Sequence, residues 1–549
     1  MLFLTQTQSI HYHYDFNGNR TTTVLPDGRQ INYLYYGSGH LHQINLDGEV
    51  VSDIERDKLH REIQRTQGAL TSRYELDPLG RLKKQIAALD NLSESGEGKS
   101  KVAAGYGHTA VKRSYGYDKT GNLLHSTDQR TGTTHFEYDK LGRITQAGNE
   151  RFAFDPAHNI LSDRHRDNAV KDNRLKEYNG TSYYYDGLGN LIHRELPNGD
   201  VQNYFYDLHD QLVKVEIFKK DGTKETWAYH YDALGRRIGK GRLKENANEV
   251  SDRHSTDHAC LKTENSKDIL DSEIAFLWDG SHLLQEQNSD GLYTYIYTDQ
   301  DSYAPLAQIR DWTNEEETEQ SIHYFHCDQI GIPREMTDKN GNLLWFGDYY
   351  GWGKLKSETN ITETAHQPFR LQNQYCDQET GLHYNFFRYY EPDVGRFVNQ
   401  DPIGLWGGEN LYFLASNILI WVDILGLRKE RTMVTLFRAM SLEELGNLRN
   451  TGQWSAPPGK MEEKWFAESL DCARLFGDSL HKHTYAIVKI KVPKSLLTKL
   501  EASGALYSMD RLDGIGPAKS ISANALNENN IKKSKTVEIR TPGGCNNEC

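Results

Sequence analysis

Histidine, cysteine and carboxylate side chains are the groups in this chain that could bind a metal ion. The cysteines lack the paired spacing of zinc sites and are far apart, at positions 260, 327, 376, 472, 545 and 549. We interpret them as reduced thiols, with Cys545 and Cys549 as the plausible pair. His326 and Asp328 lack the further partners of a metal site nearby, so a strand-end hydrogen bond explains them better. The sequence predicts no metal cofactor.

A motif that contains an aspartate recurs along the first part of the chain. Each aspartate follows an aromatic residue and precedes two or three variable residues, then Gly, then Asn or Arg, as in Tyr117-Asp118 with Gly121-Asn122. Asp can bond the backbone amides of a turn, Gly can supply the positive φ, and the aromatic side chain can pack on the next strand. These aspartates are therefore predicted to be structural, in an all-β repeat array. Further copies begin at Tyr14, Tyr138, Tyr185 and Tyr231, with a shorter copy at Tyr206-Asp207 and a degenerate copy at Leu76.

Two stretches depart from this repeat. Residues 240–271 are rich in charge and poor in aromatic side chains, which is typical of a surface insertion or flexible loop. Residues 276–353 form a less regular block that we expect to contain the last repeats.

Charge divides the chain into two parts. The whole sequence has 64 Lys and Arg against 77 Asp and Glu, a net charge of −13. Residues 428–549 carry 19 basic and 14 acidic residues, a net +5, which leaves −18 for residues 1–427. Such opposite charges would favour holding the tail against the body, and equally would favour a polyanionic target such as RNA.

Export signals are not evident in the sequence. No run approaches the roughly 20 apolar residues of a membrane-spanning helix. Residues 1–10 lack the basic region, apolar core and cleavage site of a signal peptide. We expect no membrane-spanning segment, and export, if it occurs, by specialised machinery.

The most informative stretch begins at Arg388. It reads RYYEPDVGRFVNQDPIGL, followed by GGENLY at 407–412 and WVDILGL at 421–427. This stretch closely resembles the core-terminating signature of Rhs proteins, and the repeats resemble the YD repeats of the Rhs and teneurin families. The resemblance implies a mainly β fold, in which residues 1–427 form a hollow YD-repeat β-cocoon shell with the terminating signature at 388–427. It further implies a polymorphic toxin with a separate small α+β toxin domain at 428–549.

In that family, the signature acts as an intramolecular aspartic protease that cuts just after the final Gly-Leu. Carried over here, Asp401 and Asp423 form the catalytic pair, and Leu427-Arg428 is the cleaved bond. Two carboxylates that share a proton can activate water and polarise the scissile carbonyl. In the other interpretation, both aspartates only cap turns. The chain departs from the signature at Ile418 and Ile424, where prolines that shape the loop are usual.

Residues 428–549 contain no repeat unit and show the alternating strand and helix patterns of a compact α+β domain. Strands are predicted at 434–438, 462–467, 485–492 and 536–540, and helices at 471–480 and 494–502. Ser441, with a carboxylate three residues later, is typical of another helix N-terminus. A domain of about 120 residues can bury its own core.

The sequence motifs of this domain resemble those of ADP-ribosyltransferase toxins at Rhs tails, notably type VI secretion effectors that modify elongation factor Tu. The similar stretches are LFRAMS from 436, EKWFAES from 463 and LDGIGPA from 512. The resemblance implies NAD as substrate, with Arg438 holding its pyrophosphate and Phe466 and Ser469 positioning the nicotinamide ribose.

The transferase chemistry also needs a carboxylate that stabilises the ribosyl cation as nicotinamide leaves. Glu538 on the last predicted strand is our first choice, with Asp513 and Glu468 as alternatives.

Two other functions remain open. The basic tail is compatible with a nuclease, although its histidines are His481 and His483 alone, with no paired metal-ligand cluster. A non-enzymatic YD-repeat protein for surface recognition is the second alternative, and the foreign domain after the signature argues against it.

The favoured interpretation implies several partners. These are a cognate immunity protein, a secretion component of the VgrG/PAAR type, and elongation factor Tu or ribosomal RNA as the target in the cytoplasm of another cell. We expect the shell to encapsulate the cleaved toxin without a covalent bond. The chain begins within the repeats, where an upstream delivery segment is expected, so a truncated or orphan copy is one interpretation.

Overall fold

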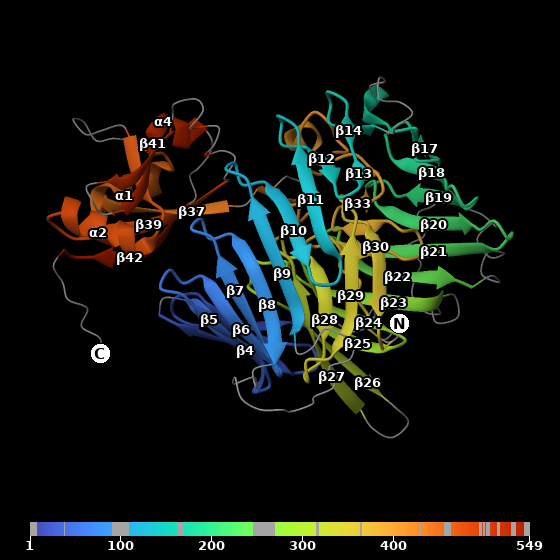
Figure 1. Cartoon of the computed structure of the whole chain (residues 1–549), viewed down its shortest axis with the longest axis horizontal. Helices are drawn as coiled ribbons and strands as arrows, with labels where there is room; N and C mark the ends of the chain where they lie inside the picture. The colour runs from blue at the N-terminus through green and yellow to red at the C-terminus, as the bar shows by residue number, and fades with distance from the viewer. Residues whose placement is uncertain are drawn as a thin grey trace. The chain divides into compact units, whose positions relative to one another are not determined.

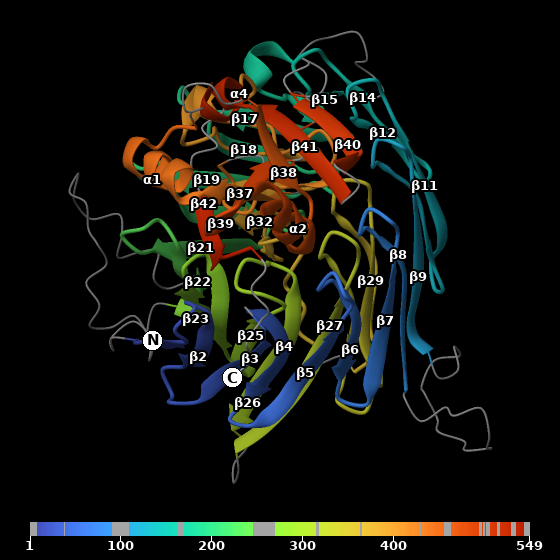
Figure 2. The same cartoon turned by 90° about the vertical axis from the view of Figure 1, so that its left-hand side faces the viewer.

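The chain divides into two compact units, Met1–Lys429 and Glu430–Cys549 (Figures 1 and 2). Strands make up 54% of the described residues and helices 8%, so the prediction of a mainly β protein is confirmed. The computed structural model describes all residues except 1–7, 38, 90–108, 162–169, 245–269, 314–317, 363–364, 428–429, 432, 455–462, 494–496, 498–499, 501–505, 513–515, 529–533 and 543–549.

The first unit begins with a 13-stranded antiparallel sheet in which each strand pairs with the next one in sequence. Its strands are β1 (His11–Tyr14), β2 (Arg20–Val24), β3 (Gln30–Tyr36), β4 (His40–Leu46), β5 (Glu49–Arg56), β6 (Glu62–Gln67), β7 (Leu70–Leu76), β8 (Leu82–Leu89), β9 (Thr109–Tyr117), β10 (Leu123–Asp128), β11 (Gly132–Tyr138), β12 (Ile144–Ala147) and β13 (Glu150–Arg151). The short pair β14 (Ala153–Phe154) and β15 (Ile160–Leu161) and the 3-10 helix η1 (Lys171–Asn173) follow.

A second sheet of 15 strands continues the same antiparallel order. It comprises β16 (Glu177–Tyr178), β17 (Thr181–Tyr185), β18 (Leu191–Glu195), β19 (Val201–Tyr206), β20 (Leu212–Phe218), β21 (Lys224–Tyr231), β22 (Arg237–Leu243), β23 (Leu270–Asp279), β24 (His282–Asn288), β25 (Gly291–Tyr297), β26 (Pro305–Thr313), β27 (Thr318–Cys327), β28 (Pro333–Thr337), β29 (Leu343–Tyr349) and β30 (Leu355–Asn360). The stretch 276–353, which the sequence indicated to be less regular, therefore lies within a regular sheet.

The repeat motif forms turns between neighbouring strands. The Asp118 carboxylate accepts hydrogen bonds from the backbone N–H and the side-chain amide of Asn122, at 2.8 and 3.0 Å. Gly121 has a φ of 93°, which favours glycine. Where Arg replaces Asn, its Nε donates to the carboxylate, as from Arg143 to Asp139 at 2.6 Å. The predicted structural role of these aspartates is confirmed.

The repeat tyrosines connect successive hairpins. The hydroxyl of Tyr138 donates to the backbone carbonyl of Leu123 at 2.7 Å, and that of Tyr206 to the carbonyl of Leu191 at 3.0 Å. The hydroxyl group of each tyrosine therefore satisfies a backbone acceptor of the preceding hairpin.

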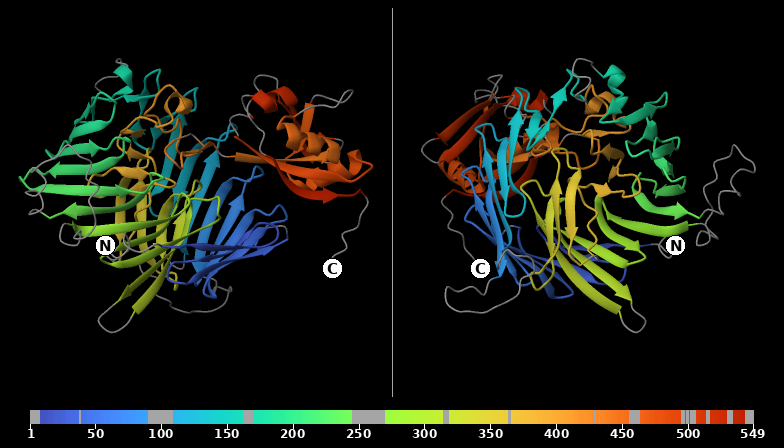
Figure 3. Two further views of the ribbon diagram at one scale, coloured as in Figure 1. Left: turned by 180° about the vertical axis from the view of Figure 1, so that it is seen from behind. Right: turned by 45° about the vertical axis from the view of Figure 1, so that its right-hand side comes forward.

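Residues 365–427, here called the closing segment, contact both large sheets. Figure 3 shows its orange portion between strands of the first and second sheets. Many of its aromatic side chains are buried in one core with both sheets. The closing segment contains the four-stranded antiparallel sheet β31 (Tyr375–Cys376), β32 (His383–Asn385), β33 (Arg388–Glu391) and β34 (Arg396–Phe397), then the 3-10 helix η4 (Gly404–Gly407) and β35 (Trp421–Val422).

Buried ion pairs join the closing segment to the second sheet. The carboxylate of Asp377 accepts hydrogen bonds from the Arg237 guanidinium at 2.6 and 2.9 Å and from the Lys240 ammonium at 2.9 Å. Arg194 of β18 likewise donates to Glu391 of β33. Because an unpaired buried charge is costly, these pairs define where the closing segment binds.

The prediction that a surface insertion begins at Lys240 is wrong. Lys240 lies within β22, is 3% exposed and is paired with two carboxylates. A charged residue can occupy a sheet interior when buried partners neutralise it. Residues 245–269 of the predicted insertion lie outside the described residues.

The second unit contains a six-stranded antiparallel sheet in the order β40-β41-β38-β37-β39-β42. Its two faces carry separate apolar clusters, one including side chains of α1 and α4 and the other side chains of α2. The bounds are β36 (Glu430–Arg431), β37 (Met433–Ser441), α1 (Leu442–Thr451), β38 (Glu463–Ala467), α2 (Leu470–Leu480), β39 (Tyr485–Pro493), β40 (Leu506–Leu512), β41 (Gly516–Ser522), α4 (Ala523–Glu528) and β42 (Ser534–Arg540).

Most of the elements predicted for this unit are present. The four predicted strands correspond to β37, β38, β39 and β42, and the helix predicted at 471–480 is α2. Ser441 caps α1 by accepting a hydrogen bond from the Glu444 N–H at 3.1 Å, as predicted. The strands β40 and β41 and helix α4 were not predicted, and most of the helix predicted at 494–502 lies outside the described residues.

Candidate functional site

The carboxylates of Asp401 and Asp423 meet at one guanidinium group in the closing segment. Nη2 of Arg388 lies 3.2 Å from Oδ2 of each aspartate, and all three side chains are at most 5% exposed. Arg388 begins β33, and Asp423 directly follows β35. The structure thus brings the two predicted aspartates together. It adds Arg388, which the sequence analysis missed although it begins the signature stretch.

The other oxygen of each aspartate closes a turn. Oδ1 of Asp401 accepts a hydrogen bond from the Ile403 N–H, and Oδ1 of Asp423 accepts one from the Leu427 N–H, both at 3.1 Å. The turn-capping interpretation therefore describes Oδ1 of each residue, whereas both Oδ2 atoms face Arg388. The Asp423 contact also ties the pair to the predicted cleavage position.

The backbone before the predicted cleavage bond is held by buried side chains. Arg388 Nε donates to the Gly426 carbonyl, and the Asn385 amide donates to the Asp423 carbonyl at 2.9 Å. Of the predicted scissile bond Leu427-Arg428, the structure describes Leu427, while Arg428 lies outside the described residues.

The Asp401 carboxylate and the Leu427 carbonyl lie beside Gly407. A Cβ atom at Gly407 would lie 2.2 Å from Oδ2 of Asp401 and 3.5 Å from the carbonyl oxygen of Leu427. Both oxygens therefore border the same small volume.

Burial changes the acidity of this group of side chains. It raises the pKa of Asp401, which the positive charge of Arg388 opposes. Burial lowers the pKa of Arg388 to about 10, against the opposing effect of Asp423 and Asp401. The guanidinium also lies 3.6 Å from the centre of the Phe397 ring, which favours a cation. A carboxyl group with a raised pKa beside a second carboxylate is a typical acid and base pair.

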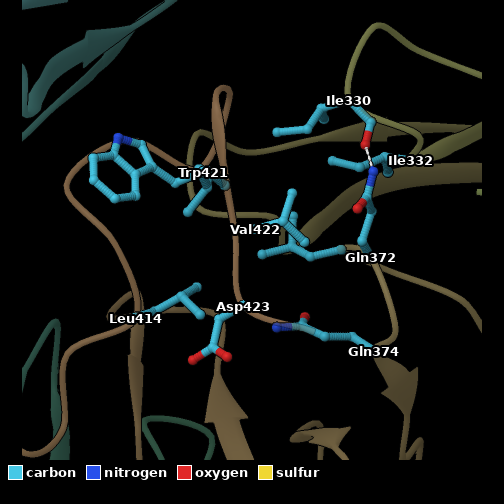
Figure 4. A pocket seen from close by; sticks show the side chains of 10 residues that line it. Ile330, Ile332, Gln372, Gln374, Leu414, Trp421, Val422 and Asp423 are labelled. Atoms are coloured by element: carbon cyan, nitrogen blue, oxygen red, sulfur yellow. Dashed lines mark hydrogen bonds between the residues drawn. The ribbon is translucent and has the colours of Figure 1, made fainter. Parts of the chain in front are cut away.

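A small pocket adjoins Asp423 (Figure 4). Figure 4 shows the Asp423 carboxylate turned away from Ile332 and Gln372. With a volume of about 20 Å³ the pocket accommodates about one water molecule, so it does not suit a larger ligand. It is lined by Ile330, Ile332, Leu371, Gln372, Gln374, Leu414, Ile418, Trp421, Val422 and Asp423.

In the second unit, Arg438 and Phe466 lie on adjacent strands and on one face of the sheet. Arg438 of β37 donates to the Trp465 carbonyl of β38 at 3.0 Å, and its guanidinium carbon lies 6.0 Å from the centre of the Phe466 ring. Arg438 Nη2 also binds both carboxylate oxygens of Glu444, at 3.0 and 3.1 Å. The buried Nε of Arg438 has no hydrogen-bond acceptor among the described residues.

The other two predicted NAD-binding residues have evident structural roles. Phe466 is 0% exposed and packs against Trp454, with ring centres 5.6 Å apart. Ser469 caps α2 by accepting a hydrogen bond from the Cys472 N–H at 3.2 Å.

Glu538 does not lie near Arg438. In the sheet, Glu538 is opposite Ile487, whereas Arg438 is opposite Val488. Neighbouring residues of a strand point to opposite faces, so Glu538 and Arg438 face different sides of the sheet. Glu538 instead binds Arg474 of α2 at 2.9 Å and Arg540 at 3.2 Å.

The alternative carboxylate Glu468 lies on the face that carries Phe466. It binds Lys519 at 3.0 Å, and Lys519 is directly opposite Phe466 in the ladder between β38 and β41. Directly opposite residues share a face. Asp513, the other alternative, lies outside the described residues.

His326 and Asp328 make separate structural contacts. His326 Nε2 shares a hydrogen bond with Thr337 Oγ1 at 2.9 Å, and Asp328 accepts from the N–H groups of Ile330 and Ile332 at 3.1 and 3.0 Å. The strand-end explanation is therefore confirmed. Within the described residues, no group of three or more potential ligands is arranged to hold a metal ion, and no helix is long and apolar enough to cross a membrane.

Known proteins resemble this chain over about three quarters of its length. Residues 99–301 match the Teneurin YD-shell family and residues 322–359 the RHS protein family. Double-stranded DNA deaminase toxin A of Burkholderia cenocepacia is 38% identical over 439 residues, covering 76% of this chain and 29% of that protein. Toxin protein Tse5 of Pseudomonas aeruginosa is 28% identical over 472 residues, covering 74% of this chain and 33% of that protein. The chain thus spans about a third or less of these relatives.

Solved structures show the same fold. The Photorhabdus luminescens Tc holotoxin pore has a TM-score of 0.52 at 16% identity, covering 76% of this chain and 21% of that one. The TcdB2-TccC3 structure has a TM-score of 0.51 at 18% identity, covering 77% and 22%. From its repeats, its closing segment and these similarities, we conclude that the first unit is similar to the shells of Rhs and teneurin YD-repeat proteins.

Proposed function

We propose that the chain is part of an interbacterial toxin that cuts itself after Leu427 and thereby separates a toxic enzyme, residues 428–549, from its shell. The observation that carries this proposal is the convergence of Asp401 and Asp423 on Arg388, beside the backbone that ends at Leu427. The printed names of the relatives, a deaminase toxin and the toxin Tse5, support the toxin class.

The geometry suggests a role for each side chain. Asp401, which borders the Leu427 carbonyl, donates a proton to the carbonyl oxygen, and ionised Asp423 takes a proton from the water that attacks the carbonyl carbon. Asp423 then passes its proton to the nitrogen of Arg428 as the C–N bond breaks. Asp401 takes back a proton from one of the two hydroxyl groups on the carbon, and Leu427 keeps the new carboxyl group. Arg388 holds both aspartates in place and offsets their charge.

Denaturing electrophoresis of the purified full chain tests self-cleavage. A fragment of about 120 residues should appear, which is long enough to fold as a domain with its own core. N-terminal sequencing of this fragment should read from Arg428. Asp423→Asn should abolish this fragment. The matched control is Asp393→Asn, which changes an exposed aspartate of the closing segment that pairs with Lys354. A single intact band from the unaltered chain would overturn the proposal.

For the separated enzyme we propose transfer of ADP-ribose from NAD to elongation factor Tu or ribosomal RNA. Support comes from the adjacency of Arg438 and Phe466 and from the buried Nε of Arg438, which keeps a donor for a ligand phosphate. Glu468 replaces Glu538 as our first choice for the carboxylate because it shares the face of Phe466, and Asp513 stays an alternative.

Transfer of label from ³²P-NAD to a bacterial lysate tests this activity. Label in a protein of the size of elongation factor Tu, or in ribosomal RNA, would support the proposal and identify the target. A nuclease is the second candidate, because a relative from Dickeya dadantii, 27% identical over 423 residues, is named a probable deoxyribonuclease. Degraded nucleic acid without label transfer would favour that candidate.

A further inference from the structure

We propose that Gly407 is a positioning residue of the self-cleavage site, because its lack of a side chain keeps the Asp401 carboxyl group beside the Leu427 carbonyl. The inference rests on the proposed self-cleavage and concerns one residue of η4. It assigns to Gly407 a role in the reaction rather than in the turn.

Three glycines lie in and beside η4, and the structure requires glycine at these positions for different reasons. Gly404 has a φ of 59° and Gly408 a φ of 124°, and a Cβ at either position would meet no atom within 4 Å. These two are required by backbone conformation. The φ of Gly407 lies outside the left-handed region, so other residues can adopt it. What Gly407 provides is space.

That space borders the reacting groups. A methyl group at residue 407 would lie 2.2 Å from Oδ2 of Asp401, well inside van der Waals contact. The Asp401 carboxylate cannot turn aside freely, because Oδ1 is bound to the Ile403 N–H at 3.1 Å and Oδ2 is paired with Arg388 at 3.2 Å. The same methyl group would lie 3.5 Å from the Leu427 carbonyl oxygen, so it would fill space that both the acid and the substrate carbonyl border.

The test uses the full chain isolated uncut in denaturant and then refolded into buffers of stepped pH, with fragment formation followed by electrophoresis. Gly407→Ala should slow cleavage on the order of 10²-fold, the usual effect of misplacing a catalytic group by about 1 Å. Displaced from Arg388, Asp401 should lose the positive charge that lowers its pKa. The alkaline limit of cleavage should therefore move to higher pH.

The matched control is Gly187→Ala, which adds a methyl group where no atom lies within 4 Å and where φ is also outside the left-handed region. This variant should cleave as the unaltered chain does. Wild-type cleavage by Gly407→Ala, or slower cleavage without a shift in the pH limit, would overturn the inference. Neither result affects the proposed self-cleavage, which fails if the unaltered chain stays intact or if the Asp423→Asn chain is still cut.

A second variant addresses folding. If the predicted clash with Asp401 prevents Gly407→Ala from folding, the double variant Gly407→Ala/Asp401→Ala should fold, because the clashing carboxylate is gone. Its thermal unfolding temperature should match that of Asp401→Ala alone, since the two effects couple through one contact. A double variant that also fails to fold would contradict the inference.

Discussion

The Arg237 guanidinium donates two hydrogen bonds to the Asp377 carboxylate, at 2.6 and 2.9 Å, and neither side chain is exposed. Replacing Asp377 by Asn would leave Arg237 with a buried charge and would remove one of the two carboxylates that Lys240 binds. Breaking such a pair costs about 3–5 kcal/mol. The free energy of unfolding of Asp377→Asn, measured in urea, should fall by that amount.

The control for this prediction is Asp393→Asn, which breaks an exposed pair with Lys354. Exposed pairs contribute about 0–1 kcal/mol. Equal losses in the two variants would show that the buried pair does not fasten the closing segment.

The raised pKa of Asp401 predicts a pH dependence of self-cleavage. Burial favours the protonated form of Asp401, which the proposed mechanism uses as the acid. The cleavage rate should therefore fall as pH rises through the folded-state pKa, which lies above the ordinary value of about 3.9. Refolding into buffers of stepped pH measures this limit. A rate independent of pH on the alkaline side would exclude Asp401 as the acid.

Asp401→Asn should lose this alkaline limit, because an amide does not release a proton in this range. The rate should drop by about 10²-fold or more, the usual contribution of a general acid. If Asp401→Asn retained the alkaline limit of the unaltered chain, a different group would have to set it.

Arg388→Lys should slow cleavage while the first unit still folds. Arg388 contacts both aspartates through Nη2 and the Gly426 carbonyl through Nε, an arrangement that requires the planar fork of arginine. Lysine keeps the charge but offers a single nitrogen. A decrease on the order of 10-fold to 10²-fold is expected for a displaced catalytic pair. Arg151→Lys, at an exposed arginine, is the matched control.

For the second unit, Glu468→Gln should reduce ADP-ribose transfer by about 10²-fold, as loss of a group that stabilises developing charge does. Glu538→Gln should change it little, because Glu538 pairs with Arg474 and Arg540 on the other face of the sheet. Arg438→Lys should impair transfer because lysine lacks the guanidinium Nε that is proposed to donate to the ligand phosphate. Incorporation of ³²P from labelled NAD compares these variants, and the opposite order for Glu468 and Glu538 would restore Glu538 as the proposed carboxylate.

Local features of the fold could be predicted from the sequence. The hydrogen bonds that close the Asp118 turn come from residues at most four positions away, so the sequence motif includes every residue that forms the turn. Contacts between distant residues could not be predicted in this way. Arg388 and Asp423 are 35 residues apart, and Arg237 and Asp377 are 140 apart.

The choice of Glu538 shows the same limit. Its strand was predicted, but the face on which its side chain lies depends on the register between β42 and β39 and between β39 and β37. A shift of one residue reverses the face of every side chain in a strand. No local sequence pattern around Glu538 indicates that register, so the sequence alone could not predict which face of the sheet carries its side chain.

The strand order of the first unit has a consequence for synthesis. In both large sheets each strand pairs with its neighbours in sequence, so contact order is low. These two sheets, here called the wall, can therefore form hairpin by hairpin as the chain leaves the ribosome. Arg388, Asp401 and Asp423 follow all of these strands, and the closing segment that carries them is buried against the wall. Under the proposed self-cleavage, a cut chain would therefore be one whose wall was already complete, and scission would serve as a record of correct assembly.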